Sequence, residues 1–397
     1  MLRDRAAARG KLIFLVTEDW YFWSHRLPVA RAARDVGFEI IVATRVRDHG
    51  ERIRGEGFRL HELPWRRRGD GILGATRAII AIAALYRRER PDVVHHVALK
   101  PVLFGAIACR LAFPRAGARP GVPGVPGVIA AVTGLGAGLA TSTMLVGLGR
   151  RLLQQALRLA ARGGRVIVQN PEDGTALTRL GVDAGRITLI RGSGVDTDHF
   201  AALPRPAGSI VTIAFVSRML RSKGVLDAVE AVRRLRERGV AVELVLAGPA
   251  DLDNRDSLDE ARLQRLAAQP GIEWLGPVDD VRAVWRRAAI AVLPSTYGEG
   301  VPKALIEAAA CARPIVTTDM PGCRDIVHDG ETGVLVPPHD IAALTEALGA
   351  LARDPARREA MGRAGRALVE REFGEAGVAR QTLALYEAVM RERASRS

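Results

Sequence analysis

The alternation of short apolar runs with helix-like segments limits the possible folds of this chain more than any other feature. Lys11–Thr17 and Glu39–Thr44 are apolar runs, and between them Arg26–Val36 has helical spacing and ends at Gly37. Apolar runs of this length are typical of strands that are buried on both faces. Strands that alternate with helices predict parallel sheets with helices on both faces, which is an α/β fold.

The same alternation starts again after Pro204-Arg205-Pro206, with an apolar run at Ile210–Val216 and helical spacing at Val225–Arg238. A chain of 397 residues is long enough for two domains of ordinary size. We therefore expect two doubly wound, Rossmann-like domains that bind ligands at the carboxyl ends of their strands. The expected domains are 1–200, with a last helix at 376–397 that crosses back to it, and 201–375.

The charge of the chain is uneven. The first 200 residues contain 31 Lys and Arg against 17 Asp and Glu, whereas the remainder contains 27 of each, so the net charge of +14 comes from the first half. Such asymmetry indicates an anionic partner, either nucleic acid or an acidic membrane surface, or reflects an arginine-rich composition. No helix-turn-helix, aromatic sheet or zinc pattern supports nucleic acid, which we do not expect as a partner.

Three features bear on the compartment. Cys109, Cys311 and Cys323 are widely spaced, which fits a reducing compartment and predicts neither a disulfide framework nor a zinc site. The first apolar run is too short for a signal peptide, so we expect a cytoplasmic protein. Gly121–Gly149 is uncharged and long enough to span a bilayer, but its eight glycines and two prolines favour a strand, a glycine-rich loop and a helix start.

A strand end, a glycine-bearing loop and a helix start follow one another at residues 294–308. The strand ends at Pro294, and the helix begins at Pro302, whose missing N–H costs nothing in a first helical turn. Free backbone N–H groups and the positive end of the helix dipole there suit a diphosphate. Glu299 and Glu307 are eight positions apart, so they should contact different parts of a ligand. Glu307 is placed to hold two adjacent hydroxyl groups.

Two cations, Arg218 and Lys223, follow the first strand of the second domain, at the edge where a ligand is expected. Together they can neutralise a diphosphate, although a solvated basic turn has the same sequence. The cations, the helix start and the carboxylates together predict a ligand that contains both phosphate and sugar hydroxyls.

These segments resemble the donor domain of glycosyltransferase family 4, the retaining GT-B enzymes. The resemblance is close from about residue 165 to the end and looser before it, and its motifs do not specify the sugar. Arg191–Phe200 also resembles the family's Asn-Gly-Val-Asp-x-x-x-Phe segment, although its first residues differ. The matching segments are Arg218 with Lys223-Gly224, Leu275-Gly276-Pro277-Val278, Glu299 to Glu307 (Glu-x7-Glu) and Asp329–Val336.

The resemblance implies a GT-B fold, in which two Rossmann-like domains face a central cleft. It also implies retaining transfer from a nucleotide sugar, for which UDP is the nucleotide expected from the family. Arg218 and Lys223 would bind the diphosphate, and with Glu299, which contacts the sugar, they are the expected catalytic residues. No cofactor and no metal are expected, although Asp251-Leu252-Asp253 has the form of a metal motif. The expected donor-binding residues are Arg218, Lys223, Gly276 (for the base), Gly298, Glu299, Gly300, Val301, Pro302, Lys303 and Glu307 (for the ribose).

Parts of the first half resemble the branch of that family that builds lipid-linked and exopolysaccharide repeat units. Trp20–Trp23 stands where many members have a glycine-rich loop, and because four consecutive aromatic residues cannot share one face, some should be exposed. His95 and His96 end a predicted strand, where partial burial is the alternative to a role with the acceptor. The expected acceptor-side residues are Ser24, His25, Arg26, His96, Lys100, Thr133, Gly134 and Gly136.

The segment Trp65–Arg88 is basic at both ends and apolar between them. It fits either a surface helix on an anionic bilayer or a core helix with basic ends. With the charge of the first half, it supports an undecaprenyl-diphosphate-linked saccharide as acceptor and peripheral attachment to the inner face of the cell membrane. The alternatives are a UDP-sugar epimerase of the same fold, which would release nucleotide without an acceptor, and a basic nucleic-acid-binding protein.

Overall fold

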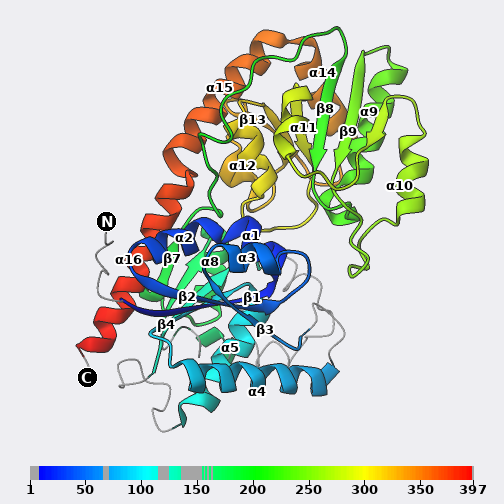
Figure 1. Cartoon of the computed structure of the whole chain (residues 1–397). Helices are drawn as coiled ribbons and strands as arrows, with labels where there is room; N and C mark the ends of the chain where they lie inside the picture. The colour runs from blue at the N-terminus through cyan, green and yellow to red at the C-terminus, as the bar shows by residue number, and fades with distance from the viewer. Residues whose placement is uncertain are drawn as a thin grey trace, which may run out of the picture. The chain divides into compact units, whose positions relative to one another are not determined.

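The computed structural model describes residues 9–65, 71–114, 125–135, 154–155, 157–158, 161 and 164–395. The chain forms two compact units (Figure 1). Unit 1 consists of Met1–Ser193 and Glu375–Ser397, and unit 2 is Gly194–Gly374. Unit 2 is therefore one continuous segment, whereas unit 1 is assembled from both ends of the chain.

The described part of unit 1 contains a seven-stranded sheet in the order β3-β2-β1-β4-β5-β6-β7. Every neighbouring pair is parallel, and β1 pairs with both β2 and β4 at the centre. The residues of β4 and β5 are all buried, as expected for strands that are covered on both faces. The strands are β1 Gly10–Glu18, β2 Phe38–Arg45, β3 Arg59–Glu62, β4 Val93–Val97, β5 Gly127–Val132, β6 Gly164–Val168 and β7 Ile187–Leu189.

Helices cover both faces of this sheet. Helices α1, α2 and α16 pack on one face, around Phe14, Phe22 and Tyr386. Helices α4 and α5 pack against each other on the other face, around Ile13, Ile82 and Ala108. The described helices of unit 1 are α1 Asp19–His25, α2 Leu27–Asp35, α3 Gly50–Gly55, α4 Gly71–Glu89, α5 Leu99–Ala112, α8 Pro171–Arg179, η3 Ala184–Arg186 and α16 Glu375–Ala394.

The last helix, α16, belongs to the core of unit 1 and lies beside α2 (Figure 1). Tyr386 is fully buried there, and its hydroxyl group shares a hydrogen bond of 2.6 Å with Nδ1 of His95 in β4. Near the end of the helix, Arg393 forms an ion pair of 2.8 Å with Asp92. Apolar and charged contacts together therefore fix α16 to the sheet.

The described strands of unit 2 form a six-stranded parallel sheet in the order β10-β9-β8-β11-β12-β13, around one large apolar core. Helix α9 packs beside α14, and α12 packs beside α15. The strands are β8 Val211–Val216, β9 Val242–Ala247, β10 Ile272–Trp274, β11 Ile290–Leu293, β12 Ile315–Thr318 and β13 Gly333–Val336. The helices are η4 Arg221–Lys223, α9 Val225–Glu237, α10 Glu260–Ala267, α11 Val281–Arg287, α12 Lys303–Ala310, α13 Cys323–Ile326, α14 Ile341–Arg353 and α15 Pro355–Glu372.

The predicted α/β class with two Rossmann-like sheets is confirmed, but several elements differ in detail. The chain is already helical at Asp19–His25, before the predicted helix, and breaks at Arg26, where φ is −124°. The structure also contains β7, which was not predicted, and β13, whose sequence was recognised only as a motif. Helix α12 begins at Lys303, so Pro302 is its N-cap and not its first residue.

No helix among the described residues is long and apolar enough to cross a membrane. Of the uncharged stretch Gly121–Gly149, residues 125–135 are described, and they contain β5 and the turn that follows it. Residues 136–149 lie outside the described residues.

The packing of α16 generates a prediction about stability. Replacing Tyr386 with Ala should lower the free energy of unfolding by about 3–5 kcal/mol, because a large buried aromatic side chain is lost and a cavity remains. Tyr386→Phe keeps the ring and should cost less, about 1–3 kcal/mol, because only the hydrogen bond to His95 is lost. Urea unfolding followed by circular dichroism measures both. Equal losses for the two variants would contradict this account.

Candidate active site

The loops after β8 and β11 meet in unit 2 at the carboxyl ends of their strands. Thr296 donates its backbone N–H to the carbonyl oxygen of Ser222, at 2.8 Å. Gly224 has a φ of +77°, and a Cβ atom there would lie 2.1 Å from the carbonyl oxygen of Pro294, so a residue with a side chain does not fit. The backbone therefore holds the predicted basic turn directly against the predicted helix-start loop.

The same contact brings together two of the predicted site residues, Lys223 and Glu299. Lys223 is 7% exposed, and its ammonium group pairs with the Glu299 carboxylate, which also accepts a hydrogen bond of 2.8 Å from the Ser295 hydroxyl. Burial lowers the pKa of Lys223, but the charge of Glu299 outweighs it, so that its pKa lies above the ordinary value. The ammonium is therefore charged at neutral pH.

The second predicted cation, Arg218, is held by the loop after β9. Its Nη1 lies 2.5 Å from Oδ2 of Asp251, whose own backbone N–H donates to the Ser257 hydroxyl at 2.8 Å. Asp256 accepts hydrogen bonds from the backbone N–H and the hydroxyl group of Ser222 in the basic turn. Asp251, considered above as part of a metal motif, is thus an ion-pair partner of Arg218.

The loop before α12 contains Gly298, Gly300 and Val301, which are all buried. It is fixed against the turn before α13, because Glu299 donates its N–H to the Pro321 carbonyl at 3.2 Å. Gly322 in that turn has a φ of +87°, and a Cβ atom there would lie 2.4 Å from the carbonyl oxygen of Gly300. No side chain caps the N-terminus of α12, which leaves its first N–H groups suited to an anion.

Glu307, one turn inside α12, is 9% exposed, and its carboxylate lies 3.8 Å from Nζ of Lys303. Burial raises the pKa of Glu307 to about 7, against the weaker opposite effect of Lys303. Gly276, expected near the base, follows β10 with a φ of +68° and accepts a hydrogen bond of 2.7 Å from the Gly248 N–H. The strand ends and helix start of unit 2 thus hold all the expected donor-side residues.

The expected acceptor-side residues lie in unit 1, and the first group surrounds the junction of α1 and α2. The Ser24 hydroxyl lies 2.6 Å from Nδ1 of His25, whose ring stacks on Tyr21 with 4.1 Å between centroids. Arg26 is only 3% exposed. Of the four consecutive aromatic residues, Phe22 is buried and the others are partly exposed, as expected.

The expectation that His96 contacts an acceptor requires correction. His96 is fully buried in β4, and its Nε2 shares a hydrogen bond of 2.9 Å with the hydroxyl group of Tyr86. A Cβ atom on Gly105 would lie 2.5 Å from its ring, so α5 closes directly over it. Burial lowers the pKa of His96 to about 3, which leaves the ring neutral. His95 is buried as well.

The remaining expected acceptor-side residues follow β4 and β5. Lys100 lies in the first turn of α5, with Nζ 5.7 Å and 5.3 Å from the ring centroids of Trp65 and Phe104. Thr133 and Gly134 follow β5 and are partly exposed. Gly136 lies outside the described residues.

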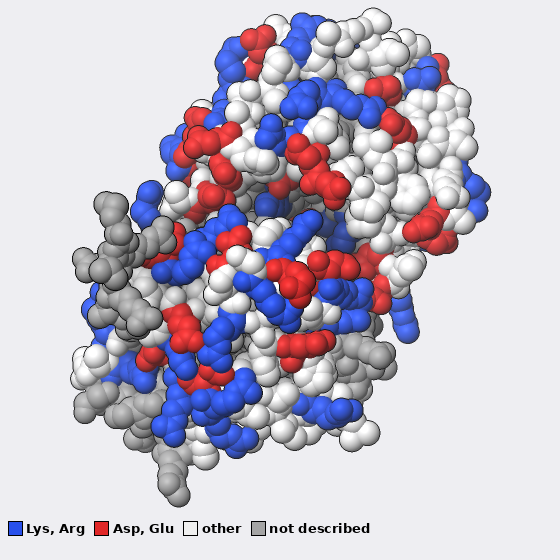
Figure 2. All heavy atoms as spheres, viewed as in Figure 1, with Lys and Arg blue, Asp and Glu red and all other residues white. Residues whose placement is uncertain are grey.

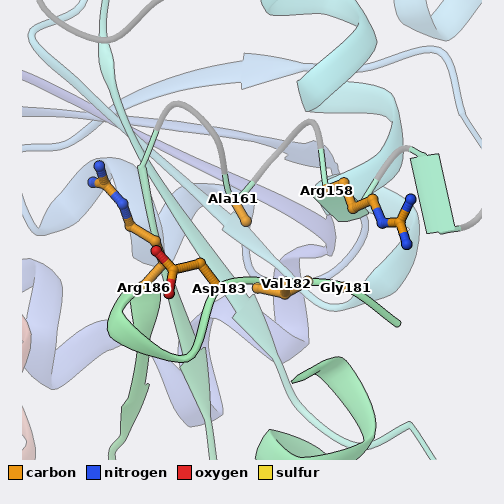
Figure 3. A pocket seen from close by; sticks show the side chains of 6 residues that line it. All are labelled: Arg158, Ala161, Gly181, Val182, Asp183 and Arg186. Atoms are coloured by element: carbon orange, nitrogen blue, oxygen red, sulfur yellow. The ribbon is translucent and has the colours of Figure 1, made fainter. Parts of the chain in front are cut away.

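A cavity of about 470 Å³ in unit 1 contains none of the expected residues (Figure 3). The side chains of Arg158 and Arg186 at its border point away from each other. Each is engaged elsewhere, because Arg158 donates to the Leu180 carbonyl at 2.9 Å and Arg186 pairs with Glu392 at 2.8 Å. We therefore do not consider it a functional site.

Comparison with known proteins agrees with this geometry. Residues 210–354 match the family described as "Glycosyl transferases group 1", and residues 11–117 match "Glycosyl transferase 4-like". The chain belongs to the GT-B glycosyltransferases. Solved structures support the fold: the HepE protein of Anabaena with UDP and glucose gives a TM-score of 0.76 at 17% identity, covering 95% of this chain and 99% of that one.

Curated relatives of this GT-B chain include polysaccharide enzymes. It is 34% identical over 239 residues to alpha-maltose-1-phosphate synthase of Mycolicibacterium smegmatis, covering 55% of this chain and 60% of the relative. It is 31% identical to the putative colanic acid biosynthesis glycosyltransferase WcaL of Escherichia coli, covering 54% of each. The alignments thus span little more than half the length of these relatives.

The buried carboxyl group of Glu307 makes stability depend on pH. Because its folded pKa of about 7 lies above the ordinary 4.5, folding favours the protonated form, so stability falls as pH rises between those values. The loss should approach about 3 kcal/mol above pH 7. Glu307→Gln should therefore gain stability relative to the wild type from pH 4.5 to 7, as measured by urea unfolding. An unchanged difference across that range would contradict the raised pKa.

Proposed function

We propose that this chain transfers a sugar, with retention of configuration, from a UDP-linked nucleotide sugar to an undecaprenyl-diphosphate-linked saccharide or polysaccharide in cell-surface glycan synthesis. The observation on which this rests is the cluster of Arg218, Lys223, Glu299 and the uncapped start of α12 at one edge of the unit 2 sheet. Its support from other proteins is that HepE was solved in complex with UDP and glucose, and that WcaL is named as a putative colanic acid biosynthesis glycosyltransferase.

In this proposal unit 2 binds the donor and unit 1 the acceptor. The diphosphate lies against Arg218, Lys223 and the N–H groups that begin α12, while Glu307 accepts hydrogen bonds from the ribose hydroxyls. Both cations already have carboxylate partners, Asp251 and Glu299. A diphosphate must therefore compete with those carboxylates, and Glu299 becomes available to the sugar hydroxyls when Lys223 turns to phosphate.

The chemistry in this proposal needs no protein nucleophile. As the bond between sugar and phosphate breaks, negative charge grows on the departing diphosphate, and fixed cations and N–H groups stabilise it. The acceptor hydroxyl attacks from the same face and gives its proton to the leaving phosphate. Because Arg218, Lys223 and the helix N-terminus supply this stabilisation, we propose that transfer requires no metal and persists in EDTA. We further propose that the enzyme works in the cytoplasm, on the inner face of the membrane, where the nucleotide sugar and the lipid-linked acceptor would meet.

Ligand stabilisation tests the donor part of the proposal. One member of a panel of nucleotide sugars should stabilise the wild type, by about 3 kcal/mol at a hundredfold excess over its Kd, in thermal unfolding. Glu307→Ala should lose this effect, whereas Glu260→Ala, which removes an exposed carboxylate on α10, should keep it. If no nucleotide sugar stabilises the wild type, the proposal fails. Release of nucleotide without an acceptor would favour an epimerase instead.

The roles of the cluster residues can be separated by comparing the binding of UDP with that of uridine, which lacks the diphosphate. Arg218→Ala and Lys223→Met should each weaken binding of UDP by roughly tenfold or more, because a charge-assisted hydrogen bond is lost. They should leave the binding of uridine, which has no phosphate, unchanged. Glu307→Ala should weaken both ligands. Isothermal titration calorimetry measures these affinities, and a loss of uridine binding in Arg218→Ala would show that this arginine does not act on the diphosphate.

A further inference from the structure

Unit 1 exposes large apolar side chains on two helices that pack against each other, α4 and α5. Ile72 and Leu73 in the first turn of α4 are 87% and 83% exposed, and Ile80 is 53% exposed. On α5, Ile107 and Leu111 are 38% and 49% exposed. These five are most of the eight large hydrophobic residues exposed in the described part of the chain. We call this surface the outer face of α4–α5.

The exposed side chains are not needed to pack unit 1. Leu73, Arg77 and Ile80 are three to four positions apart, so they lie on one side of α4. The opposite side buries Ile82 and Leu85 in the core that α4 shares with α5. The outer face is thus an apolar surface separate from the folding core, and such surfaces mark interaction sites.

The exposed charged residues described on α4 and α5 are all basic. Arg77, Arg87 and Arg110 are exposed and form no ion pair with any described residue. The only acidic residue of α4 and α5, which are described throughout, is Glu89, which is buried and paired with Arg59. Figure 2 shows Lys and Arg among uncharged residues along the edge of unit 1 where α4 lies.

Among the described residues of α4 and α5, the exposed apolar side chains thus occur with cations, and this combination fits one occupant best. Anionic lipid headgroups attract arginine, and the interface between headgroups and acyl chains accepts isoleucine and leucine. A second copy of this face would bring like charges together, which opposes a dimer.

We propose that the outer face of α4–α5 docks on an anionic lipid bilayer. Ile72, Leu73 and Ile80 enter the headgroup region, and Arg77, Arg87 and Arg110 bind lipid phosphates. This inference rests on the proposed function, because a lipid-linked acceptor requires the enzyme to work at the membrane surface. The inference differs from a general attraction of the basic unit 1 to the membrane, because it assigns membrane binding to α4 and α5.

Sedimentation with vesicles tests the apolar part. The chain of 397 residues should pellet with vesicles that contain phosphatidylglycerol and much less with phosphatidylcholine alone. Leu73→Asp and Ile80→Asp should each lower partitioning at least tenfold, and because both side chains are exposed, the fold should survive. Leu252→Asp is the matched control, because Leu252 in unit 2 is 84% exposed.

The charged part has its own variants. Arg77→Ala and Arg110→Ala should each lower partitioning about fivefold, and added salt should reduce this difference. Arg265→Ala, an exposed arginine on α10 of unit 2, should leave partitioning unchanged.

Four results would overturn the inference. They are equal binding to both kinds of vesicle, unchanged vesicle binding in Leu73→Asp, an equal loss in Leu252→Asp and Leu73→Asp, or a wild-type dimer in light scattering that Leu73→Asp converts to monomer. Thermal stabilisation by a nucleotide sugar, measured on the same variants, tests the proposed function separately from the docking face. If Leu73→Asp keeps both that stabilisation and vesicle binding, only the docking face is wrong; if vesicles bind but no nucleotide sugar does, only the proposed function fails.

Discussion

The ion pair between the buried Lys223 and the partly buried Glu299 is the interaction on which the arrangement of unit 2 depends. A buried charge without a partner costs several kcal/mol, so the buried ammonium group of Lys223 requires the Glu299 carboxylate. The pair joins the loop after β8 to the loop after β11, where the backbone bond from Thr296 to Ser222 adds to it. One ion pair and one backbone hydrogen bond thus hold the two loops together. In the proposed function, donor binding is consequently an exchange of partners and not the filling of an unoccupied positive pocket.

The sequence was most informative where one local rule decides the structure. Strands buried on both faces must be continuous apolar runs, so β1, β2 and β8 could be located to within a residue at each end. Strands such as β7 and β13, with three and four residues, are too short to show a period. The ion pairs of the site were not predictable, because Lys223 and Glu299 are 76 positions apart and Arg218 and Asp251 are 33 apart.

His96 shows a different limit of sequence reasoning. Its place at the end of a strand was predicted, but position along a strand does not say whether a neighbouring helix covers the side chain. That depends on the small residue at Gly105, which lets α5 approach the ring, and on the Tyr86 hydroxyl group, which shares a hydrogen bond with its Nε2. Both partners come from helices whose packing follows only from the assembled sheet. A buried, neutral histidine is then compatible with the core.

The membership of α16 in unit 1 also has a consequence for biosynthesis. Residues 194–374 are synthesised as one continuous piece, so unit 2 has all its strands before the chain is finished. Unit 1 begins first, but its face around Phe14 and Phe22 stays open until Tyr386 has been synthesised. The N-terminal unit is therefore the last to complete its core, and during that interval it exposes apolar surface that a chaperone can bind.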